Sequence, residues 1–332
     1  MPHSIAIVGA TGAVGEKMRE VVESRRFPFR SIKFLASQKS AGKKIEFAGK
    51  TYSVEGLSAE AFRGIDIVLS STPASVSKEW SPIAARAGAI VIDNSSAWRM
   101  DPEVPLVVPE VNPQALDRVP KGIIANPNCS TIQMVVVLKP LHDRAGLKRV
   151  VVATYQASSG KGATGLRDLD DQIRALGQGK PVPAAKAHAA QLAGNVISHD
   201  WKTGEEGYSE EEWKIMLETR KILGLPDLRI TVTTARVPVR TGHSEAVNVE
   251  LERPLDAREA RDCLAKAEGI TLLEQPMPLE AEGKDQVFVG RVREDRSVPH
   301  GLNLWIVADN LRKGAATNAV QIAELVAKRI KS

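Results

Sequence analysis

This chain of 332 residues has little cysteine, few aromatic side chains and no long apolar run. Two cysteines allow at most one disulfide, which argues against a disulfide framework and for a reducing compartment, so we expect a cytoplasmic protein. No apolar run approaches the ~18 residues of a membrane span. The first residues also lack the charged and apolar regions of a signal peptide. We therefore expect neither a membrane protein nor a secreted one.

The charge is modest, with a formal net value of +5 and basic residues mixed with acidic ones. No basic tract is interleaved with aromatic residues, so we expect no nucleic-acid partner. A mildly basic surface favours anionic substrates. We expect no metal ion. The length suffices for two domains, each with its own core.

The first 130 residues alternate strand-like and helix-like patterns, which indicates βαβ units and a parallel sheet. The expected strands are 5–8, 32–36, 65–70 and 89–93, and the expected helices are 16–24 and 78–87.

From residue 148 the pattern changes to a mixed α/β domain with a largely antiparallel sheet. The expected strands are 148–156, 229–239 and 246–251, and the expected helices are 165–176 and 209–223. The stretch 177–190 is rich in Gly, Pro and Ala, which predicts an exposed loop. A last helix, 315–330, has an apolar face that could pack on the first domain.

A glycine-rich run at 9–15, Gly-Ala-Thr-Gly-Ala-Val-Gly, follows the first strand and precedes a helix. Glycines permit a tight turn and close backbone approach, and the helix N-terminus can meet a phosphate. In this position the run predicts a dinucleotide site. The alternative is a strand–helix turn without a ligand.

The second strand ends in the run 36–42, Ala-Ser-Gln-Lys-Ser-Ala-Gly. An NAD site usually places Asp or Glu here for the ribose hydroxyls, and none is present. Ser37, Lys39 and Ser40 suit a 2′-phosphate instead, so we predict NADP rather than NAD. The alternative is that Lys39 is a solvated loop lysine.

Cys129 lies in the run Asn-Pro-Asn-Cys-Ser-Thr at 126–131, just before an apolar stretch. The Pro-Asn pair predicts a turn and Ser130 and Thr131 a helix start. The positive end of a helix favours thiolate over thiol, and thiolate is the nucleophile. Alternatively, Cys129 is a buried structural cysteine. Cys263 lies inside a predicted helix, 260–265, and is expected in the core.

Three polar residues of the second domain are candidates for a site. Gln156 ends a strand and opens a Gly-rich turn, 157–165, which could equally be a flexible loop. Arg236 lies among apolar strand residues, so it needs either a substrate carboxylate or an internal Asp or Glu. His243, in a loop before a strand, suits acid–base chemistry and could activate a thiolate, although a lone loop histidine is usually unremarkable.

Charged residues near two other segments could bind anions. Ser209 and Glu212 form a capping box, which explains Glu212 structurally. Glu211 and Lys214 share a helix face, often as a mere surface ion pair. Arg99 follows the fourth strand, near the carboxyl ends where α/β sheets bind ligands. The sequence thus allows a phosphate site with both cations.

With these residues assembled, the chain resembles the aspartate-β-semialdehyde dehydrogenase family from end to end. Four fragments in order carry the resemblance: residues 9–15, 93–99, 126–131, and 236–239 leading into 242–245. The implied fold is α/β, a Rossmann-type parallel-sheet nucleotide domain plus a mixed substrate and dimerisation domain. The implied domains are 1–130 for NADP, completed by a C-terminal helix 311–332, and 131–310 for substrate and dimerisation. A homodimer or homotetramer is expected.

The resemblance implies NADPH-dependent reductive dephosphorylation of L-aspartyl-4-phosphate to L-aspartate 4-semialdehyde, on the route to lysine, threonine and methionine. Cys129 would form a thioester, with His243 as acid–base group and Gln156 orienting the acyl group. The implied substrate residues are Arg236 and Glu211 for the amino-acid head group, and Arg99, Asn128 and Lys214 for phosphate. The implied cofactor positions are Gly9, Thr11, Gly12, Ala13, Val14, Lys39, Ser40, Ser159, Gly160 and Asn310. Lys161 stands where many relatives have a small residue.

Three other readings compete. N-acetyl-γ-glutamyl-phosphate reductase uses the same acyl-phosphate logic, but the surroundings of Cys129 and the Gly-His-Ser-Glu run fit the semialdehyde family better. A glyceraldehyde-phosphate-type dehydrogenase has its nucleophile in a different sequence setting. A non-catalytic NADP-binding paralogue would be favoured by a missing Cys, His or substrate Arg, and all three are present.

Overall fold

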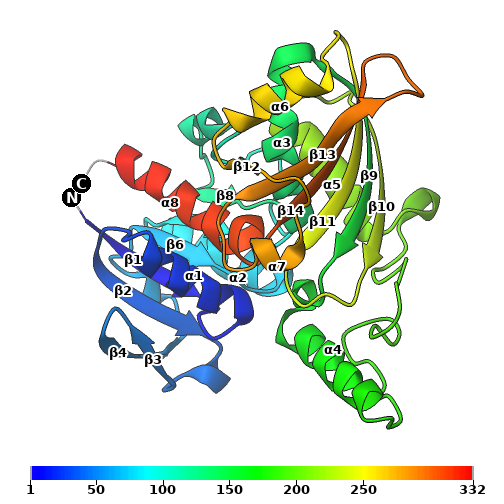
Figure 1. Cartoon of the computed structure of the whole chain (residues 1–332). Coiled ribbons are helices and arrows are strands. Elements are labelled where there is room, and N and C mark those ends of the chain that lie inside the picture. Colours follow the sequence, from blue (N-terminus) through cyan, green and yellow to red (C-terminus); the bar gives the residue numbers. More distant parts are fainter. Residues whose placement is uncertain (1, 331–332) are drawn as a thin grey trace. The chain divides into compact units, whose positions relative to one another are not determined.

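The computed structural model describes residues 2–330, which form two compact units (Figure 1). The first unit runs to Asn128 and resumes at Ala315, and the second is Cys129–Gly314. The predicted final segment, 311–332, extends to two residues, 331 and 332, that lie outside the described residues. None of the helices within 2–330 combines the length and apolar content that a bilayer crossing requires.

The first unit contains a six-stranded sheet in the order β5-β2-β1-β6-β7-β8, and every neighbouring pair is parallel. The strands are β1 His3–Val8, β2 Phe29–Ala36, β5 Glu55–Gly56, β6 Ile67–Ser70, β7 Ile90–Asp93 and β8 Ile123–Ala125. The parallel sheet and the four predicted strands are confirmed. The sequence reading missed β5 and β8, which are too short to show a pattern.

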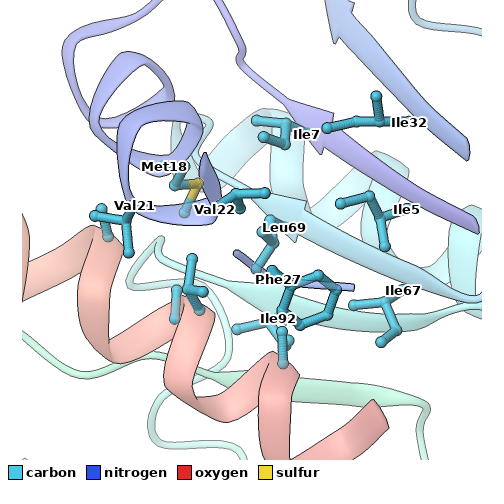
Figure 2. Close-up of a cluster of buried hydrophobic side chains, with 14 of the residues drawn as sticks. Ile5, Ile7, Met18, Val21, Val22, Phe27, Ile32, Ile67, Leu69 and Ile92 are labelled. Carbon is cyan, nitrogen blue, oxygen red and sulfur yellow. The ribbon is translucent and has the colours of Figure 1, made fainter. Parts of the chain in front are cut away.

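The α-helices among the described residues of this unit are α1 Ala13–Ser24, α2 Ala74–Arg86 and α8 Thr317–Arg329. Figure 2 shows Met18 and Val22 of α1 on the side of Leu69 of the sheet, and Val21 and Ile92 belong to the same buried cluster. Helix α8 contacts α1, β6 and β7, and its apolar face belongs to the same core. Helix α8 is therefore part of the first unit's core rather than an appended tail.

A hairpin, β3 Lys44–Phe47 with β4 Lys50–Ser53, was also not predicted. The side chains of β3 alternate between exposed and buried, as in a half-buried strand. Phe47 and Tyr52 pack edge-on against Phe34 of β2. The hairpin thus uses several of the chain's few aromatic residues to extend the first core.

Strand β1 is the point where the strand order of the first sheet reverses. It pairs with β2 on one side and with β6 on the other. Ligands of open α/β sheets bind outside the carboxyl ends of the strands at such a reversal. The glycine-rich run leaves β1 at this end, so topology and sequence motif indicate the same place.

The second unit contains a six-stranded sheet in the order β10-β9-β11-β14-β13-β12 (Figure 1). The strands are β9 Leu147–Gln156, β10 Arg229–Arg236, β11 His243–Leu251, β12 Ile270–Leu272, β13 Val287–Asp295 and β14 Gly301–Ala308. The outer pairs, β10 with β9 and β12 with β13, are parallel, and the central pairs are antiparallel. The prediction of a mixed, largely antiparallel sheet is confirmed. Strand β10 ends at Arg236, short of the predicted 239, and Pro238 has no N–H to donate.

The helices of this unit are α3 Cys129–Ala145, α4 Gly162–Gly177, α5 Glu210–Leu223, α6 Ala257–Ala265 and α7 Pro278–Ala281. Helix α3 contacts β9, β11, β13 and β14, while α5 contacts β10 and α6 contacts β12 and β13. Residues 132–138 of α3 are all buried, as expected of a helix that is apolar on every side. Cys263 in α6 is only partly buried, so the prediction of a core position is wrong.

Candidate active site

The glycine run after β1 makes a turn whose glycines have different tasks. Gly9 has φ +78°, and a Cβ on it would overlap the Ser71 carbonyl oxygen after β6. A Cβ on Gly15 would overlap the carbonyl oxygen of Gly9. On Gly12, the N-cap of α1, a Cβ would meet only that same oxygen at 3.4 Å. Gly9 and Gly15 are therefore required by packing, whereas Gly12 leaves exposed space at a helix N-terminus.

The other predicted cofactor residues of the first unit lie around the same sheet edge. Thr11 is exposed in the turn, and Ala13 and Val14 form the first turn of α1. Lys39 and Ser40 lie in a short 3-10 turn after β2, where Lys39 is exposed. The turn offers a cation and a hydroxyl group, which suits a 2′-phosphate.

Arg99 is held at the carboxyl ends of two parallel strands. Its Nε donates to the Asn126 carbonyl oxygen, 2.9 Å away, and a terminal nitrogen donates to the Asn94 carbonyl oxygen at 2.8 Å. Asn94 follows β7 and Asn126 follows β8. The Arg99 residue is only 9% exposed despite its charge. Asn128, the residue at which the chain leaves this unit for the second, is also buried. The predicted location of Arg99 is confirmed.

Cys129 is the first residue of α3 and is partly exposed. The helix thus begins at the cysteine itself, one residue before the predicted start. One turn later, the Gln133 amide donates to the main-chain oxygen of His243 at 3.3 Å. Gly314 lies in a π-helical turn, Arg312–Ala316, and a Cβ on it would be 3.0 Å from the Cys129 Cβ. The thiol therefore lies where helix dipoles stabilise negative charge, and the same helical turn is joined to the histidine strand.

His243 is the first residue of β11 and is fully buried, so the predicted loop position is wrong. Its Nδ1 accepts a hydrogen bond from the Ala157 N–H at 2.9 Å. Its Nε2 is buried without a hydrogen-bond partner among the described residues. Burial, and then the Arg236 charge, hold the pKa of His243 well below its usual range. The ring is thus neutral at pH 7, with its proton on Nε2.

Arg236 ends β10 and is 2% exposed. Its Nε donates to Asp200 Oδ2 at 2.9 Å, and a terminal nitrogen donates to the Ala157 carbonyl oxygen at 2.7 Å. The internal acid that the sequence allowed as an alternative is therefore present. A Cβ on Gly160 would lie 2.9 Å from that terminal nitrogen and 3.5 Å from His243 Nε2. Arg236 and His243 thus border one point, the position that a side chain at residue 160 would occupy.

Three further predicted residues form a row. Gln156 ends β9, and its amide donates to Glu211 Oε1 at 3.2 Å. Lys214 Nζ lies 3.8 Å from Glu211 Oε2, which confirms the shared helix face. The capping box of Ser209 and Glu212 at the start of α5 is also confirmed. Glu211 therefore lies between an amide and a cation at the carboxyl end of the β9–β10 pair.

Asn310 joins the remaining predicted residues of the second unit. Its Oδ1 accepts from Ser159 Oγ at 3.0 Å and from the Gly242 N–H at 2.9 Å. These two bonds hold the turn that contains Ser159 and Gly160 beside Gly242, the residue preceding His243. The Gly-rich turn is thus an ordered part of the site and not a flexible loop.

Sequence reasoning missed three groups that the structure brings to this site. Asp200 holds Arg236, the main chain of Ala157 holds both Arg236 and His243, and Glu245 is a buried carboxyl two residues beyond His243. No local pattern identifies the first two, because each acts on residues distant in the sequence. The run Gly-His-Ser-Glu did contain Glu245, but its role in packing was not evident.

Two family descriptions and several known proteins are similar to this chain. The family descriptions "Semialdehyde dehydrogenase, NAD binding domain" and "Semialdehyde dehydrogenase, dimerisation domain" match residues 4–119 and 138–313. The aspartate-semialdehyde dehydrogenase of Aquifex aeolicus is 53% identical, with 99% of both chains covered. That of Synechocystis is 49% identical, covering 99% of this chain and 98% of the relative.

Solved structures are similar as well. The crystal structure of aspartate semialdehyde dehydrogenase II from Vibrio cholerae superimposes with a TM-score of 0.97 at 46% identity, and both chains are covered completely. The same enzyme complexed with ASA gives the same values. On its sequence, its two matched domains and its fold, the chain belongs to the aspartate-semialdehyde dehydrogenase family.

Proposed function

We propose that this protein catalyses NADPH-dependent reductive dephosphorylation of L-aspartyl-4-phosphate to L-aspartate 4-semialdehyde. The observation that carries the proposal is the buried pair His243 and Arg236 around Gly160, in the same unit as Cys129. The relatives from Aquifex and Synechocystis bear the name of this enzyme, which supports the proposal.

In the first step the Cys129 thiolate attacks the acyl carbon of the substrate. An S–C bond forms, the C–O bond to phosphate breaks, and inorganic phosphate leaves with the electron pair. The product is a thioester on Cys129. A helix N-terminus stabilises the thiolate before the attack and can supply N–H groups to the negative oxygen during it.

In the second step the thioester is reduced. NADPH, when bound, supplies the hydride to the acyl carbon. His243 contributes through Nε2, since Nδ1 is occupied by the Ala157 N–H. A neutral ring with its proton on Nε2 donates a hydrogen bond to the oxygen that gains charge, and proton transfer must pass through the same nitrogen. Cleavage of the C–S bond then releases the aldehyde and returns the thiolate.

The substrate's charged groups determine which residues bind it. Arg236 would bind the α-carboxylate and Glu211 the ammonium, with Gln156 next to Glu211 orienting the acyl group. Arg99, Asn128 and Lys214 would hold phosphate. A guanidinium binds such oxyanions with paired hydrogen bonds, which lysine alone does not offer.

The proposed domains are 1–130 with the C-terminal segment 311–332 for NADP, and 131–310 for substrate, with boundaries that differ by a few residues from those of the two compact units. The exposed space at Gly12 fits a pyrophosphate, and Lys39 and Ser40 would bind the 2′-phosphate. Ser159, Gly160 and Asn310 would contact the nicotinamide half. Lys39→Ala should weaken NADPH binding about tenfold and leave NADH unchanged, as fluorescence titration would measure. Equal weakening of both would contradict NADP preference at this position.

We further propose a homodimer formed by the open face of the second sheet. Helices α3, α5 and α6 cover one face. On the other face Val151, Ala153, Ala246 and Trp305 are partly exposed, and the Trp305 ring packs 5.3 Å from that of Tyr155. Ala153, Ala246 and Trp305 are register neighbours across three strands, so the apolar stripe is continuous. A second copy is the expected occupant, since the family description of this unit is a dimerisation domain. Ala246→Asp should yield monomers in light scattering; an unchanged dimer or tetramer would place the interface elsewhere.

The deciding experiment runs the reaction backwards. Aspartate semialdehyde, NADP and inorganic phosphate are mixed with the protein, and NADPH absorbance is followed with and without phosphate. Phosphate-dependent NADPH formation is expected and would support a role in lysine, threonine and methionine synthesis. Turnover of N-acetylglutamate semialdehyde alone would favour the reductase family instead. NADP binding without turnover of either substrate would favour a non-catalytic protein.

A further inference from the structure

Arg236 is fixed by groups from a segment that none of the four family fragments includes. The segment 188–201 follows α4, and its main chain bridges to β10 through Ile197 N–H to Arg236 O at 3.0 Å and the reverse bond at 2.8 Å. From this segment Asp200 accepts the Arg236 Nε–H at 2.9 Å. Trp201 lies against the guanidinium face, with its ring 4.6 Å from the Arg236 Cζ. One edge and one face of the guanidinium are therefore occupied.

Asp200 is itself anchored by several donors. His188 Nδ1 lies 3.1 Å from Oδ2, and the Ala189 N–H donates to Oδ1 at 2.8 Å. Lys161 Nζ donates to the Asp200 main-chain oxygen at 2.7 Å and lies 3.7 Å from its carboxylate. The carboxylate is completely buried. Burial alone would raise its pKa, but the bonds from His188, Ala189 and Arg236 hold the pKa below its usual range. Asp200 is thus charged at neutral pH.

The contacts close into a ring. His188 Nε2 lies 2.8 Å from Ser158 Oγ, and Ser158 follows Ala157, whose carbonyl oxygen accepts from Arg236. The Ala157 N–H in turn holds His243. Displacing Asp200 would therefore move the Arg236 guanidinium and, through Ala157, disturb the His243 ring.

We propose that Asp200 is the positioning residue of this site: with His188 and Lys161 it fixes the Arg236 guanidinium so that its remaining edge receives the substrate carboxylate. The inference rests on the proposed function of Arg236. It also gives Lys161 a task, because a small residue at this position could not reach Asp200. Arg236 is preorganised in this way, so the substrate does not have to order the side chain on binding.

The test compares Asp200→Asn with the control Asp171→Asn. Asp171 forms an exposed ion pair with Arg174 on α4, so the control removes the same charge from the same unit. In Asp200→Asn the KM for aspartate semialdehyde should rise about 10- to 100-fold, the range expected for a lost hydrogen bond to a charged group. The KM for phosphate should change less than about twofold. The control should alter neither constant.

A double-mutant cycle separates positioning from a general structural role. Arg236→Lys lacks the Nε donor, so adding Asp200→Asn to it should raise the KM for aspartate semialdehyde far less than in the wild type. If the single Asp200→Asn protein fails to fold, His188→Gln tests the same ring with a smaller expected effect. An unchanged KM for aspartate semialdehyde, or an equal rise in the KM for phosphate, would overturn the inference.

A readout without turnover keeps the two proposals distinct. The Nε–H resonance of Arg236, identified by its absence in Arg236→Lys, should exchange slowly with solvent in the wild type and quickly in Asp200→Asn. Slow exchange with no turnover of aspartate semialdehyde would contradict the proposed function while supporting the ring. Fast exchange in the wild type would overturn the ring itself.

Discussion

The candidate sites of the two units consist of different chemical groups, although both lie at the carboxyl ends of parallel strands. In the first unit the end of β1 carries glycines, and the candidate site consists there of main-chain atoms at a helix N-terminus. In the second unit the ends of β9 and β10 carry Gln156 and Arg236, and the site consists of buried ionisable side chains.

This difference determines which substitutions each site tolerates. The glycine turn after β1, which is built from main chain, is sensitive to added volume, because a Cβ there meets fixed backbone. A site built from buried ionic groups is sensitive to the loss of one partner, because an uncompensated charge remains in the interior. The following predictions test that contrast, from the largest expected effect to the smallest.

Replacing the nucleophile should have the largest effect of all. Cys129→Ser should lower phosphate-dependent turnover at least about 10⁴-fold, because the weaker nucleophile does not form the thioester. The thermal midpoint should stay near the wild-type value. Cys263→Ser is the matched control, since that thiol is partly buried in α6 and should not affect turnover. Comparable activity in both variants would exclude the thioester route.

In the first unit, Gly9→Ala should lower the free energy of unfolding by about 3–5 kcal/mol, because of positive-φ strain and overlap with the Ser71 carbonyl. Gly42 is a matched control with φ +84° and nothing within 4 Å of its Cβ position. Gly42→Ala should therefore cost only about 1–2 kcal/mol. Urea unfolding followed by circular dichroism measures both. Equal losses would show that the close approach to Ser71 does not matter.

Gly12→Ala should separate ligand binding from stability. Its Cβ would meet only one oxygen at ordinary contact distance, so unfolding should change by less than about 1 kcal/mol. NADPH affinity should fall about tenfold, because the methyl group enters the space where the pyrophosphate would approach. Unchanged affinity in a fluorescence titration would mean that the cofactor does not use this turn.

Glu245→Gln should change the pH dependence of stability in the second unit. Burial raises the pKa of Glu245 well above its usual value, so the folded chain keeps this proton while the unfolded chain loses it above pH 4.5. Wild-type stability therefore falls as pH rises from 4.5 toward the folded pKa, and the variant should lack this fall. Between pH 6 and pH 7 the free energy of unfolding of the variant should rise relative to that of the wild type by at most about 1.4 kcal/mol.

Glu250→Gln, on the same strand, provides a control of opposite sign. Its hydrogen bond to Lys148 holds the pKa of Glu250 below its usual value, so the contribution of this carboxylate is present at neutral pH and lost on acidification. Chemical unfolding at several pH values measures the free energy of unfolding of each variant relative to the wild type. With rising pH this difference should increase for Glu245→Gln and decrease for Glu250→Gln. Parallel curves would mean that Glu245 is charged in the folded protein.

Much of the fold could be predicted from sequence pattern alone, because hydrophobic periodicity and glycines at turns are signals that span only a few residues. The four main strands of the first sheet, the capping box at Ser209 and the helix after residue 128 were all predictable. The short strands β5 and β8 were not, because two or three residues carry no periodicity. The strand position of His243 was not predicted, because its neighbours Arg240 and Gly242 are typical of a loop. In the structure His243 pairs with Ala308 of β14.

By itself, the sequence determined which chemistry is available: a thiol at a helix start, a histidine, an arginine among apolar residues and a glycine turn after a strand. Only the tertiary structure decided the state of these groups. Ala157 fixes the ring proton of His243 on Nε2, and Asp200 fixes Arg236 from another part of the chain. The physical reason is that charge state and orientation depend on burial and on hydrogen-bond partners. Those partners lie 36 and 86 residues away in the sequence and are brought together only by folding.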